Sequence, residues 1–288
     1  MRSLRAAYVL FVFLASSAVV IPWQSFALRV KRFGYKRMPY LYQRFLMKLF
    51  DVRVTVIGTP IQDRGVLMVA NHTSYMDILI LGGIASVSFV AKAEVAGWAL
   101  FGTFARLQRT VFVERERRSR TAQSRDQIRE RLLEGDALVL FPEGTSNDGN
   151  RVLPFKSALM GAAEAVIGTD AQGGPLHVPV QPVSVAYGSV HGLPMGREYR
   201  PFFAWYGDMD LIPHLWEQLV TGPIDVTVEF HPAMTVDTVG GRKALAARAE
   251  AVVRRGQARA LSGRHGAKAP ESAPSAPAAA PALSGASA

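Results

Sequence analysis

A strand, a polar turn and a helix follow one another in Val66-Leu67-Met68-Val69-Ala70-Asn71-His72-Thr73-Ser74-Tyr75-Met76-Asp77. The β-branched and apolar run at 66–69 predicts a buried strand, and the residues from 76 to 84 predict a helix. Residues that suit turns and helix N-caps separate the two elements. His72 and Asp77 therefore follow the carboxyl end of a strand, where sheets of α/β proteins often carry reactive groups.

His72 and Asp77 have the chemistry of a base and its orienting carboxylate. Histidine accepts a proton near neutral pH, and a hydrogen-bonded aspartate fixes its tautomer and stabilises the imidazolium. On a regular helix, a separation of five residues turns two side chains about 140° apart. The pair can therefore meet only if His72 lies in the turn and Asp77 has already entered the helix. The alternative interpretation is a capping aspartate beside an unrelated loop histidine.

The middle of the chain repeats this alternation of strand and helix. Such alternation indicates an α/β fold with a mixed, largely parallel sheet flanked by helices. The two prolines of Val178-Pro179-Val180-Gln181-Pro182-Val183 predict an edge strand or the end of a strand. Further strands are predicted at 52–57, 88–91, 110–113, 137–141, 178–185 and 225–230, and further helices at 116–133, 156–167 and 242–255.

The composition limits the class of protein. The 288 residues include 33 Lys and Arg against 23 Asp and Glu, giving a net charge of +10, and 49% are hydrophobic. A disordered chain would be poorer in apolar residues, and a polytopic membrane protein would contain several apolar runs of bilayer length. With no cysteine, the chain has no disulfide, thiolate zinc site or cysteine nucleophile. The basic excess indicates an anionic partner, which can be nucleic acid, an acidic protein or a membrane surface.

The N-terminal region contains an apolar run from 6 to 28 without a charged residue. As a helix that rises about 1.5 Å per residue, it can cross a hydrocarbon core of about 30 Å. Three interpretations are open: a spanning anchor, a re-entrant hairpin favoured by Pro22, and a signal peptide with the small residues Ala15-Ser16-Ser17-Ala18. Basic residues are denser after the run, which predicts that this side is cytoplasmic.

The segments that flank the main domain differ in character. Residues 35–50 mix aromatic and basic side chains, as a helix at the headgroup boundary of a membrane does, although an amphipathic core helix has the same pattern. From about Ser262 the chain is rich in Ala, Pro and Ser and is expected to be a disordered tail. We therefore predict an anchor with a basic amphipathic helix at 1–50, a main domain at 51–256 and a tail at 257–288.

A second polar motif, Phe141-Pro142-Glu143-Gly144-Thr145-Ser146, ends the strand predicted at 137–141. A carboxylate followed by glycine and threonine can hold a polar head group, because the motif offers acceptors and donors together. The alternative is a turn at the end of the strand with a solvated glutamate.

Four ordered blocks resemble the glycerolipid acyltransferase family, typified by 1-acyl-sn-glycerol-3-phosphate O-acyltransferase. The blocks are Asn71-His72 to Asp77, Thr110-Val111-Phe112-Val113-Glu114-Arg115, Phe141-Pro142-Glu143-Gly144-Thr145, and Val178-Pro179-Val180 to Pro182-Val183. One block alone is a weak signal, but four blocks at family-like spacing over roughly 52–187 are a strong one. The resemblance implies an enzyme that acylates a lyso-lipid.

The resemblance also implies roles for individual residues. His72 is the general base for the acceptor hydroxyl, Asp77 orients it, and the hydroxyl attacks an acyl thioester without any cofactor or metal. The implied partners are acyl carrier protein or acyl-CoA as donor, a lyso-lipid acceptor and the inner membrane, with the catalytic domain on its cytoplasmic face. The implied acceptor-binding residues are Arg115, Glu143, Gly144 and Thr145.

The chain departs from the family directly after the Glu-Gly-Thr motif. Members that use lysophosphatidic acid commonly have arginine there, where a guanidinium can fork onto phosphate, whereas this chain has Ser146. Either Arg115 or Arg151 contacts a phosphate, or the head group is a different one. Residues 141–156 resemble the branch that acylates lyso-ornithine lipid, and Asp148 fits a zwitterionic head. Both acceptors therefore remain open.

Other functions fit the sequence less well. No nucleic acid is expected, because no element with the pattern of a nucleic-acid reader is found. A metal site from His72, Asp77, Glu143 and Asp148 lacks tight ligand spacing. The main alternative is a non-catalytic protein that binds anionic lipid, but it has no need of polar residues after strand ends. One arginine cluster fits an acidic carrier protein, coenzyme A phosphates, a membrane or a solvated helix face: Arg106, Arg109, Arg115, Arg117, Arg118, Arg120 and Arg125.

Overall fold

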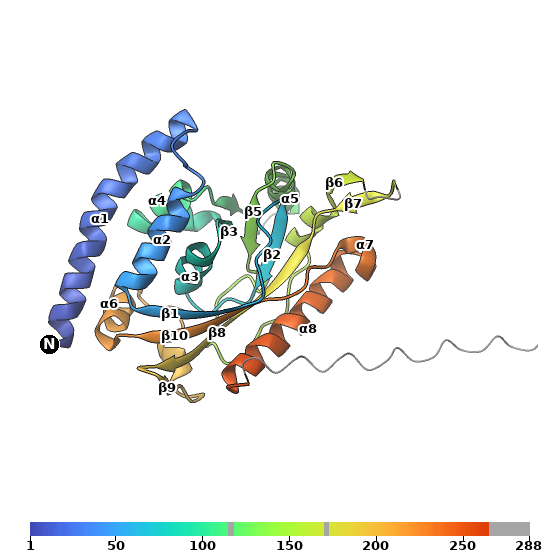
Figure 1. Ribbon diagram of the computed structural model, residues 1–288. Helices are drawn as coiled ribbons and strands as arrows, with labels where there is room; N and C mark the ends of the chain where they lie inside the picture. Colours follow the sequence, from blue (N-terminus) through green and yellow to red (C-terminus); the bar gives the residue numbers. More distant parts are fainter. Residues whose placement is uncertain (115–117, 170–172, 265–288) are drawn as a thin grey trace, which may run out of the picture.

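The computed structural model describes residues 1–114, 118–169 and 173–264. The strands of its central sheet are β1 (Val52–Ile57), β2 (Val66–Ala70), β3 (Ser88–Lys92), β4 (Val111–Val113), β5 (Ala137–Leu140), β8 (Val180–Val190), β9 (Leu193–Pro194) and β10 (Ile224–Phe230). Their order is β1-β10-β8-β2-β5-β3-β4, with β9 paired to β8. Along this order every neighbouring pair is parallel except β10 and β8, so the predicted mixed, largely parallel sheet is confirmed (Figure 1).

Helices and short helical turns cover the sheet and its ends. The α-helices are α1 (Arg2–Val30), α2 (Met38–Leu49), α3 (Met76–Ile84), α4 (Ala99–Leu107), α5 (Arg118–Leu133), α6 (Leu211–Thr221), α7 (Val236–Val239) and α8 (Arg242–Leu261). The 3-10 turns are η1 (Ala93–Gly97), η2 (Leu159–Glu164) and η3 (Arg200–Phe202), and a separate hairpin consists of β6 (Val166–Thr169) and β7 (Pro175–His177).

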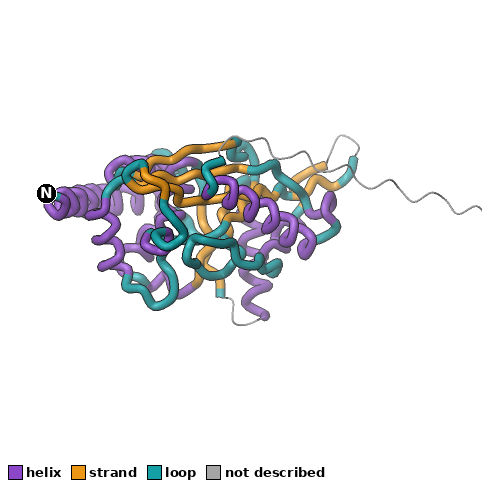
Figure 2. Tube along the Cα trace, turned by 90° about the horizontal axis from the view of Figure 1, so that it is seen from below, coloured by secondary structure: helices purple, strands orange, loops and turns teal. Residues whose placement is uncertain are grey.

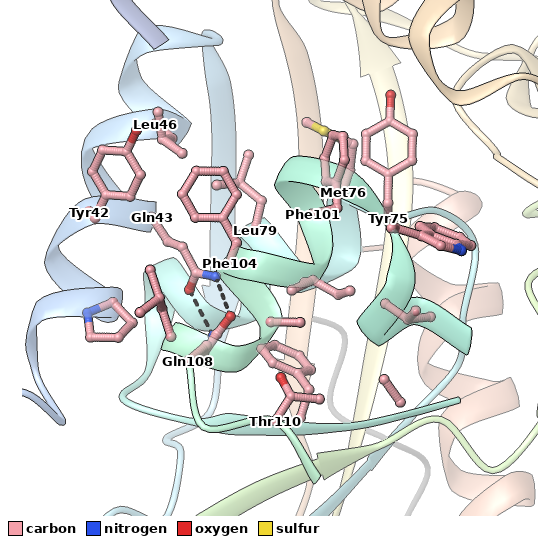
Figure 3. A pocket seen from close by; sticks show the side chains of 18 of the residues that line it. Tyr42, Gln43, Leu46, Tyr75, Met76, Leu79, Phe101, Phe104, Gln108 and Thr110 are labelled. Carbon is pink, nitrogen blue, oxygen red and sulfur yellow. Dashed lines mark hydrogen bonds between the residues drawn. The ribbon is translucent and has the colours of Figure 1, made fainter. Parts of the chain in front are cut away.

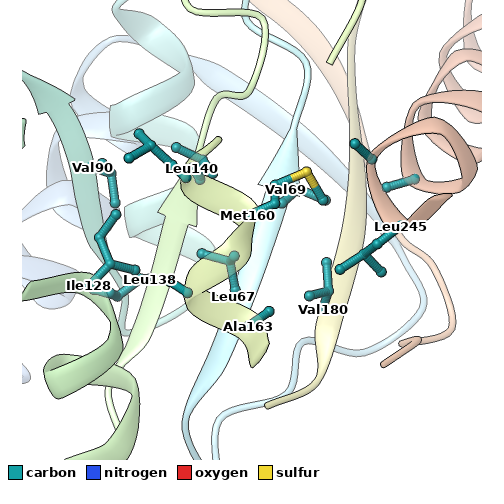
Figure 4. Close-up of a cluster of buried hydrophobic side chains, with 14 of the residues drawn as sticks. Leu67, Val69, Val90, Ile128, Leu138, Leu140, Met160, Ala163, Val180 and Leu245 are labelled. Atoms are coloured by element: carbon teal, nitrogen blue, oxygen red, sulfur yellow. The ribbon is translucent and has the colours of Figure 1, made fainter. Parts of the chain in front are cut away.

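The sheet lies between two helical layers because its inner strands bury both faces. In β2, Val66 and Met68 join a hydrophobic cluster with α3, whereas Leu67 and Val69 join a cluster with α5, η2 and α8. Every residue of β2 is buried, which is the pattern of a parallel strand covered on both sides. The second cluster is drawn in Figure 4, where side chains from β2 lie among residues of η2 and near Ile128 and Leu245.

The N-terminal helices form a further layer at one end of the molecule (Figure 2). α1 continues unbroken through Pro22, and the chain turns back only at 31–37, so that α2 lies beside α1 (Figure 1). Within the described residues, α1 alone is long and apolar enough to cross a membrane, by length and composition only. One side of α1 is buried against α2, α4 and α6, and the other side exposes apolar residues: Leu4, Tyr8, Phe11, Val19, Trp23, Phe26 and Val30.

The helix predicted at 156–167 is wrong. This segment forms the short turn η2 and then the strand β6. The small residues Gly161, Ala162 and Ala163 are buried, and the two alanines belong to the cluster shared with α5 and α8. Close packing with these helices, and not the helix propensity of the residues, decides the local conformation. The β-branched pair Val166 and Ile167 then enters the hairpin with β7.

The proline-containing strand is an inner strand, between β10 and β2, and the predicted edge position is wrong. The second alternative, a strand terminus, describes only Pro179, which precedes β8. Pro182 lies inside β8, opposite Val69 of β2 and one residue before Val183, the first residue that pairs with β10. The carbonyl of Pro182 still accepts a hydrogen bond from His231 N at 3.0 Å.

Several other boundaries differ from the predictions. α4, α6 and the hairpin of β6 and β7 were not predicted, and α8 continues past 255 to Leu261. Residues 35–50 contain α2, which packs on α3 through one side and exposes Leu41, Arg44, Phe45 and Lys48 on another. α2 therefore packs in the core through one side and exposes a mixture of basic and apolar side chains on another.

Candidate active site

The two polar motifs meet because β2 and β5 are parallel neighbours, and their carboxyl ends lie at the same edge of the sheet. Asn71 fixes the turn after β2 to β8. Its side-chain nitrogen donates to Val185 O at 2.9 Å, and its side-chain oxygen accepts from Val185 N at 2.8 Å. This reciprocal pair continues the hydrogen bonding of the sheet past β2 and so sets the position of His72.

His72 and Asp77 form the predicted pair. His72 lies in the turn and Asp77 in the first turn of α3, so His72 Nδ1 is 2.9 Å from Asp77 Oδ2. The histidine side chain is 20% exposed, whereas the aspartate is fully buried. The imidazole stacks on the Phe141 ring, with the two centroids 4.1 Å apart. A partly accessible base on a buried carboxylate is suited to take a proton from a bound substrate.

The Asp77 carboxylate is held by donors from two parts of the fold, the turn after β2 and strand β8. Besides His72, Oδ2 accepts from Thr73 N at 2.7 Å and Ser74 N at 3.0 Å, while Oδ1 accepts from the Tyr187 hydroxyl at 2.7 Å. Burial, and then the charge of Asp77, raise the pKa of Tyr187 well above its ordinary value, so the phenol remains a donor. Tyr187 was not predicted, and its only signal in the sequence is a polar residue in an apolar strand.

Glu143 is buried, and protein donors bind both of its oxygens. Oε1 accepts from His72 N at 3.1 Å, and Oε2 accepts from Asn147 Nδ2 at 2.7 Å. The Asn147 backbone also donates to His72 O at 3.2 Å. Burial raises the pKa of Glu143 to about 7, although hydrogen bonds from His72, Asn147 and Leu153 oppose the rise. Glu143 is therefore not a solvated glutamate, and it ties the second motif to the His72 turn.

Residues 195–209 close a third side of the site, which sequence analysis did not predict. Trp205 N donates to Thr73 O at 3.0 Å, and Ser146 Oγ donates to Trp205 O at 2.5 Å. The Trp205 backbone is thus hydrogen-bonded both to the turn after β2 and to the motif that contains Glu143. The Tyr75 hydroxyl lies 3.0 Å from Nδ1 of His214, which attaches α6 to the same turn. The segment lacks strand or helix periodicity, so its position could not be predicted from the pattern of residues.

The remaining predicted residues lie around the second motif. Gly144 has a φ of +80°, a left-handed conformation that favours glycine and lets the chain turn after Glu143. Thr145 and Arg151 are exposed. Arg115 lies outside the described residues. The structure therefore brings together His72, Asp77, Glu143 and Gly144.

An apolar cavity begins at the other side of the His72 turn, where Tyr75 and Met76 line it. Two of its polar side chains, Gln43 and Gln108, form a hydrogen-bonded pair at 2.9 Å (Figure 3). A cavity of this kind suits a hydrocarbon chain rather than a charged group. Its walls come from α1, α2, α3, α4, β3 and α6 and include Phe13, Tyr42, Leu79, Phe89, Phe104 and Leu215.

The fold therefore places a histidine against a buried carboxylate at the edge of the sheet, with an apolar cavity beside them. The family model named Acyltransferase matches residues 53–186. The lyso-ornithine lipid O-acyltransferase of Brucella abortus is 46% identical over 91% of this chain and 97% of the relative. The 1-acyl-sn-glycerol-3-phosphate acyltransferase of Neisseria gonorrhoeae is 30% identical over 60% of this chain and 63% of the relative.

A solved structure agrees with these relatives. The crystal structure of the 1-acyl-sn-glycerophosphate acyltransferase PlsC from Thermotoga maritima matches with a TM-score of 0.60 and 25% identity, over 90% of this chain and 97% of that chain. The chain belongs to the acyltransferase family, as the four sequence blocks predicted, and it is an O-acyltransferase of lipid metabolism.

The raised pKa of Glu143 predicts a pH dependence of stability. A carboxyl whose pKa is about 7 in the folded state and 4.5 ordinarily binds its proton more tightly when folded. This contribution to stability is complete below about pH 4.5 and is lost as pH rises through about 7. The free energy of unfolding of the wild type should therefore fall over this range, and Glu143→Gln should show a smaller fall.

Denaturant unfolding in detergent between pH 5 and pH 8 measures this difference. Glu198→Gln is the matched control, because Glu198 is exposed, and it should keep the wild-type slope. Identical slopes for wild type and Glu143→Gln would contradict the assignment.

Proposed function

We propose that this protein transfers a fatty acyl group from an acyl thioester to the free hydroxyl of a lyso-ornithine lipid. The 2.9 Å contact between His72 and Asp77 at the carboxyl end of β2 carries the proposed chemistry. The 46% identity to an enzyme named for this acceptor, over nearly its whole length, supports the choice of acceptor.

In the proposed mechanism His72 is the general base. Asp77 accepts a hydrogen bond from Nδ1–H, which leaves the lone pair on Nε2 to take the proton of the acceptor hydroxyl. The oxygen attacks the thioester carbonyl, and the tetrahedral intermediate collapses with cleavage of the carbon–sulfur bond. The departing thiolate recovers the proton from the imidazolium. No covalent enzyme intermediate is needed, because the base and both substrates are held together.

Glu143, Gly144 and Thr145 are proposed to shape the acceptor site. The contacts of Glu143 with His72 and Asn147 favour an indirect role, in which its carboxylate sets the position of the loop. Thr145 and Arg151 are exposed at this loop and are available to a head group. Arg115 remains a proposed acceptor residue from the family pattern alone.

1-acyl-sn-glycerol-3-phosphate is the second candidate acceptor. A relative at 30% identity and the enzyme in the PlsC crystal structure are named for this acceptor. The hydrogen bond from Ser146 to the Trp205 carbonyl, at the position where phosphate-using members commonly have arginine, favours the lyso-ornithine lipid.

The donor is proposed to be acyl carrier protein or acyl-CoA. Of the arginine cluster predicted to bind it, Arg115 and Arg117 lie outside the described residues. Arg109 is bonded to the buried Asp136, at 2.8 and 3.1 Å, a carboxylate that Lys36 and Arg131 also contact. Arg106 donates to the backbone at Ala96, and Arg125 is next to Asp126. Because these arginines already contact groups of the protein, a structural role for the cluster is as well supported as a role in docking the donor.

The protein is proposed to act at the cytoplasmic face of the inner membrane. The exposed apolar side of α1 supports membrane contact, because exposing so many large apolar side chains to water is unfavourable. α1 packs along α2, α4 and α6, which favours a helix that lies against the domain over a free anchor. The apolar cavity is proposed to hold one acyl chain next to the base.

Replacement of the base gives the first test. His72→Ala should lower kcat by about 10²- to 10⁴-fold, the usual contribution of a general base, while expression and membrane association remain intact. Acyl transfer from labelled acyl carrier protein in membranes measures the rate. His177→Ala, on the hairpin outside the central sheet, is the control and should keep full activity. Transfer at a near wild-type rate in His72→Ala would exclude the proposed base.

The choice of acceptor is tested with the wild-type enzyme. Membranes receive labelled acyl carrier protein with lyso-ornithine lipid or with lysophosphatidic acid, and the two products are quantified. We expect the higher kcat/KM with lyso-ornithine lipid. Equal values would mean that Ser146 and its surroundings carry no selectivity, and a preference for lysophosphatidic acid would exclude the proposed acceptor.

The cavity is tested by filling it. Leu79→Trp adds volume to a side chain that lines the cavity, so the enzyme should transfer shorter chains in place of longer ones. Competition between donors of different chain length measures this change. Leu41→Trp, at an exposed position of α2, is the control and should keep the wild-type chain profile. An unchanged profile in Leu79→Trp would place the chain elsewhere.

A further inference from the structure

Two opposite charges beside the His72 turn have no part in the mechanism above. Asp148 lies in the loop after the Glu-Gly-Thr motif, and Arg200 begins η3. The side chain of Asn150 contacts both. Its oxygen accepts from a terminal guanidinium nitrogen of Arg200 at 3.0 Å, and its nitrogen donates to Asp148 Oδ2 at 3.3 Å. One amide therefore holds a cation at one end and an anion at the other.

Neither charge is neutralised by the part of the chain that the structure describes. No carboxylate forms an ion pair with Arg200 there, and no cation forms one with Asp148. Arg200 Nε is buried and has no hydrogen-bond partner in the same ranges. Burial, and then the nearby Arg197, lower the pKa of Arg200. A bound anion would compensate a cation in this environment.

The charged pair lies next to the reacting groups. Gly149, between Asp148 and Asn150, is so close to Thr73 that a Cβ on the glycine would lie 3.0 Å from Thr73 Cγ2. Thr73 follows His72 directly, and its hydroxyl is buried without a hydrogen-bond partner in the described ranges. Trp205, on the segment that carries Arg200, donates to the carbonyl of Thr73. A head group between Asp148 and Arg200 would therefore lie beside the base.

We propose that Asp148 and Arg200 form the head-group site for a zwitterionic amino-acid lipid, in which Arg200 binds the carboxylate and Asp148 the ammonium group. The planar guanidinium matches a carboxylate, and a carboxylate attracts the point charge of an ammonium. This inference rests on the proposed acceptor, because an ornithine acylated on one nitrogen keeps one carboxylate and one ammonium group.

The arrangement also accounts for Ser146. The guanidinium comes from η3 rather than from the position after the Glu-Gly-Thr motif. Asn150 separates the two charges, so they are not lost to a direct ion pair with each other. A phosphomonoester would gain the attraction of Arg200 but would meet repulsion from Asp148. The pair therefore selects against a head group that carries only negative charge.

Kinetics of variants test the two roles. Arg200→Gln should raise the KM for lyso-ornithine lipid by about 10- to 100-fold with kcat nearly unchanged, because it removes a charged hydrogen bond made in the ground state and the transition state alike. Asp148→Asn should raise that KM less and should lower the KM for lysophosphatidic acid. The matched controls are Arg64→Gln and Asp63→Asn, two exposed charges before β2 and at the opposite end of that strand from His72, which should leave both KM values unchanged.

A substrate analogue provides a test that needs no variant. In a carboxamide analogue of the lyso-ornithine lipid, a neutral amide replaces the carboxylate. The wild type should show a KM for the analogue that is higher by the same factor as Arg200→Gln shows for the natural lipid. Arg200→Gln should not raise the KM for the analogue further, because the group that it recognises is already absent.

The outcomes separate this inference from the proposed function. If the wild type acylates lyso-ornithine lipid and uses the carboxamide analogue equally well, the inference is wrong and the proposed function stands. If Arg64→Gln has as large an effect as Arg200→Gln, general surface charge explains the result and the inference is also wrong. If the wild type acylates only lysophosphatidic acid, the proposed acceptor is wrong and the head-group assignment fails with it.

Discussion

The Asp77 carboxylate joins three parts of the fold at one point. It accepts hydrogen bonds from the His72 ring, from the backbone of the turn and from Tyr187 on β8. A buried carboxylate is unfavourable unless such donors surround it, so the turn, the helix and the sheet are each held to one geometry. Because Asn71 also bonds to β8, the position of the imidazole depends on the register between β2 and β8. The chemistry is thus supported by the sheet rather than by the loop alone.

The meeting of His72 and Glu143 could be predicted, because both follow strands, and neighbouring parallel strands present their carboxyl ends together. The contacts of Tyr187 and Trp205 could not, since they depend on strand register and on the path of an irregular segment. The same limit applies to Arg200, which reaches the site through Asn150. The wrong prediction of a helix at 156–167 has a related cause. The conformation of the small residues there is decided by packing against distant helices and not by their own helix propensity. Sequence patterns located the motifs, whereas long-range packing supplied their partners.

His72 stands between two environments of opposite character. On one side are the polar turn with Glu143 and the loop that carries Asp148 and Asn150, and on the other is a cavity lined by aliphatic and aromatic side chains. An amphiphile that spans both regions would have its polar and apolar parts on either side of the imidazole. The His72 ring stacks on Phe141, and Phe141 stacks on Phe89 of the cavity wall. These rings connect the polar turn directly with the wall of the cavity. Orientation of the substrate therefore follows from solvation of its two ends.

α1 has a second role besides its exposed apolar side. Phe13, Val20 and Gln24 of this helix line the cavity, and Gln24 also donates to the carbonyls of Tyr35 and Leu107. Deletion of the first thirty or so residues, a common way to obtain a soluble fragment, would thus remove one wall of the chamber and admit water to its hydrocarbon lining. A truncated enzyme of this kind would be a poor substitute for the intact one in inhibitor screening, since the missing helix is part of the cavity wall.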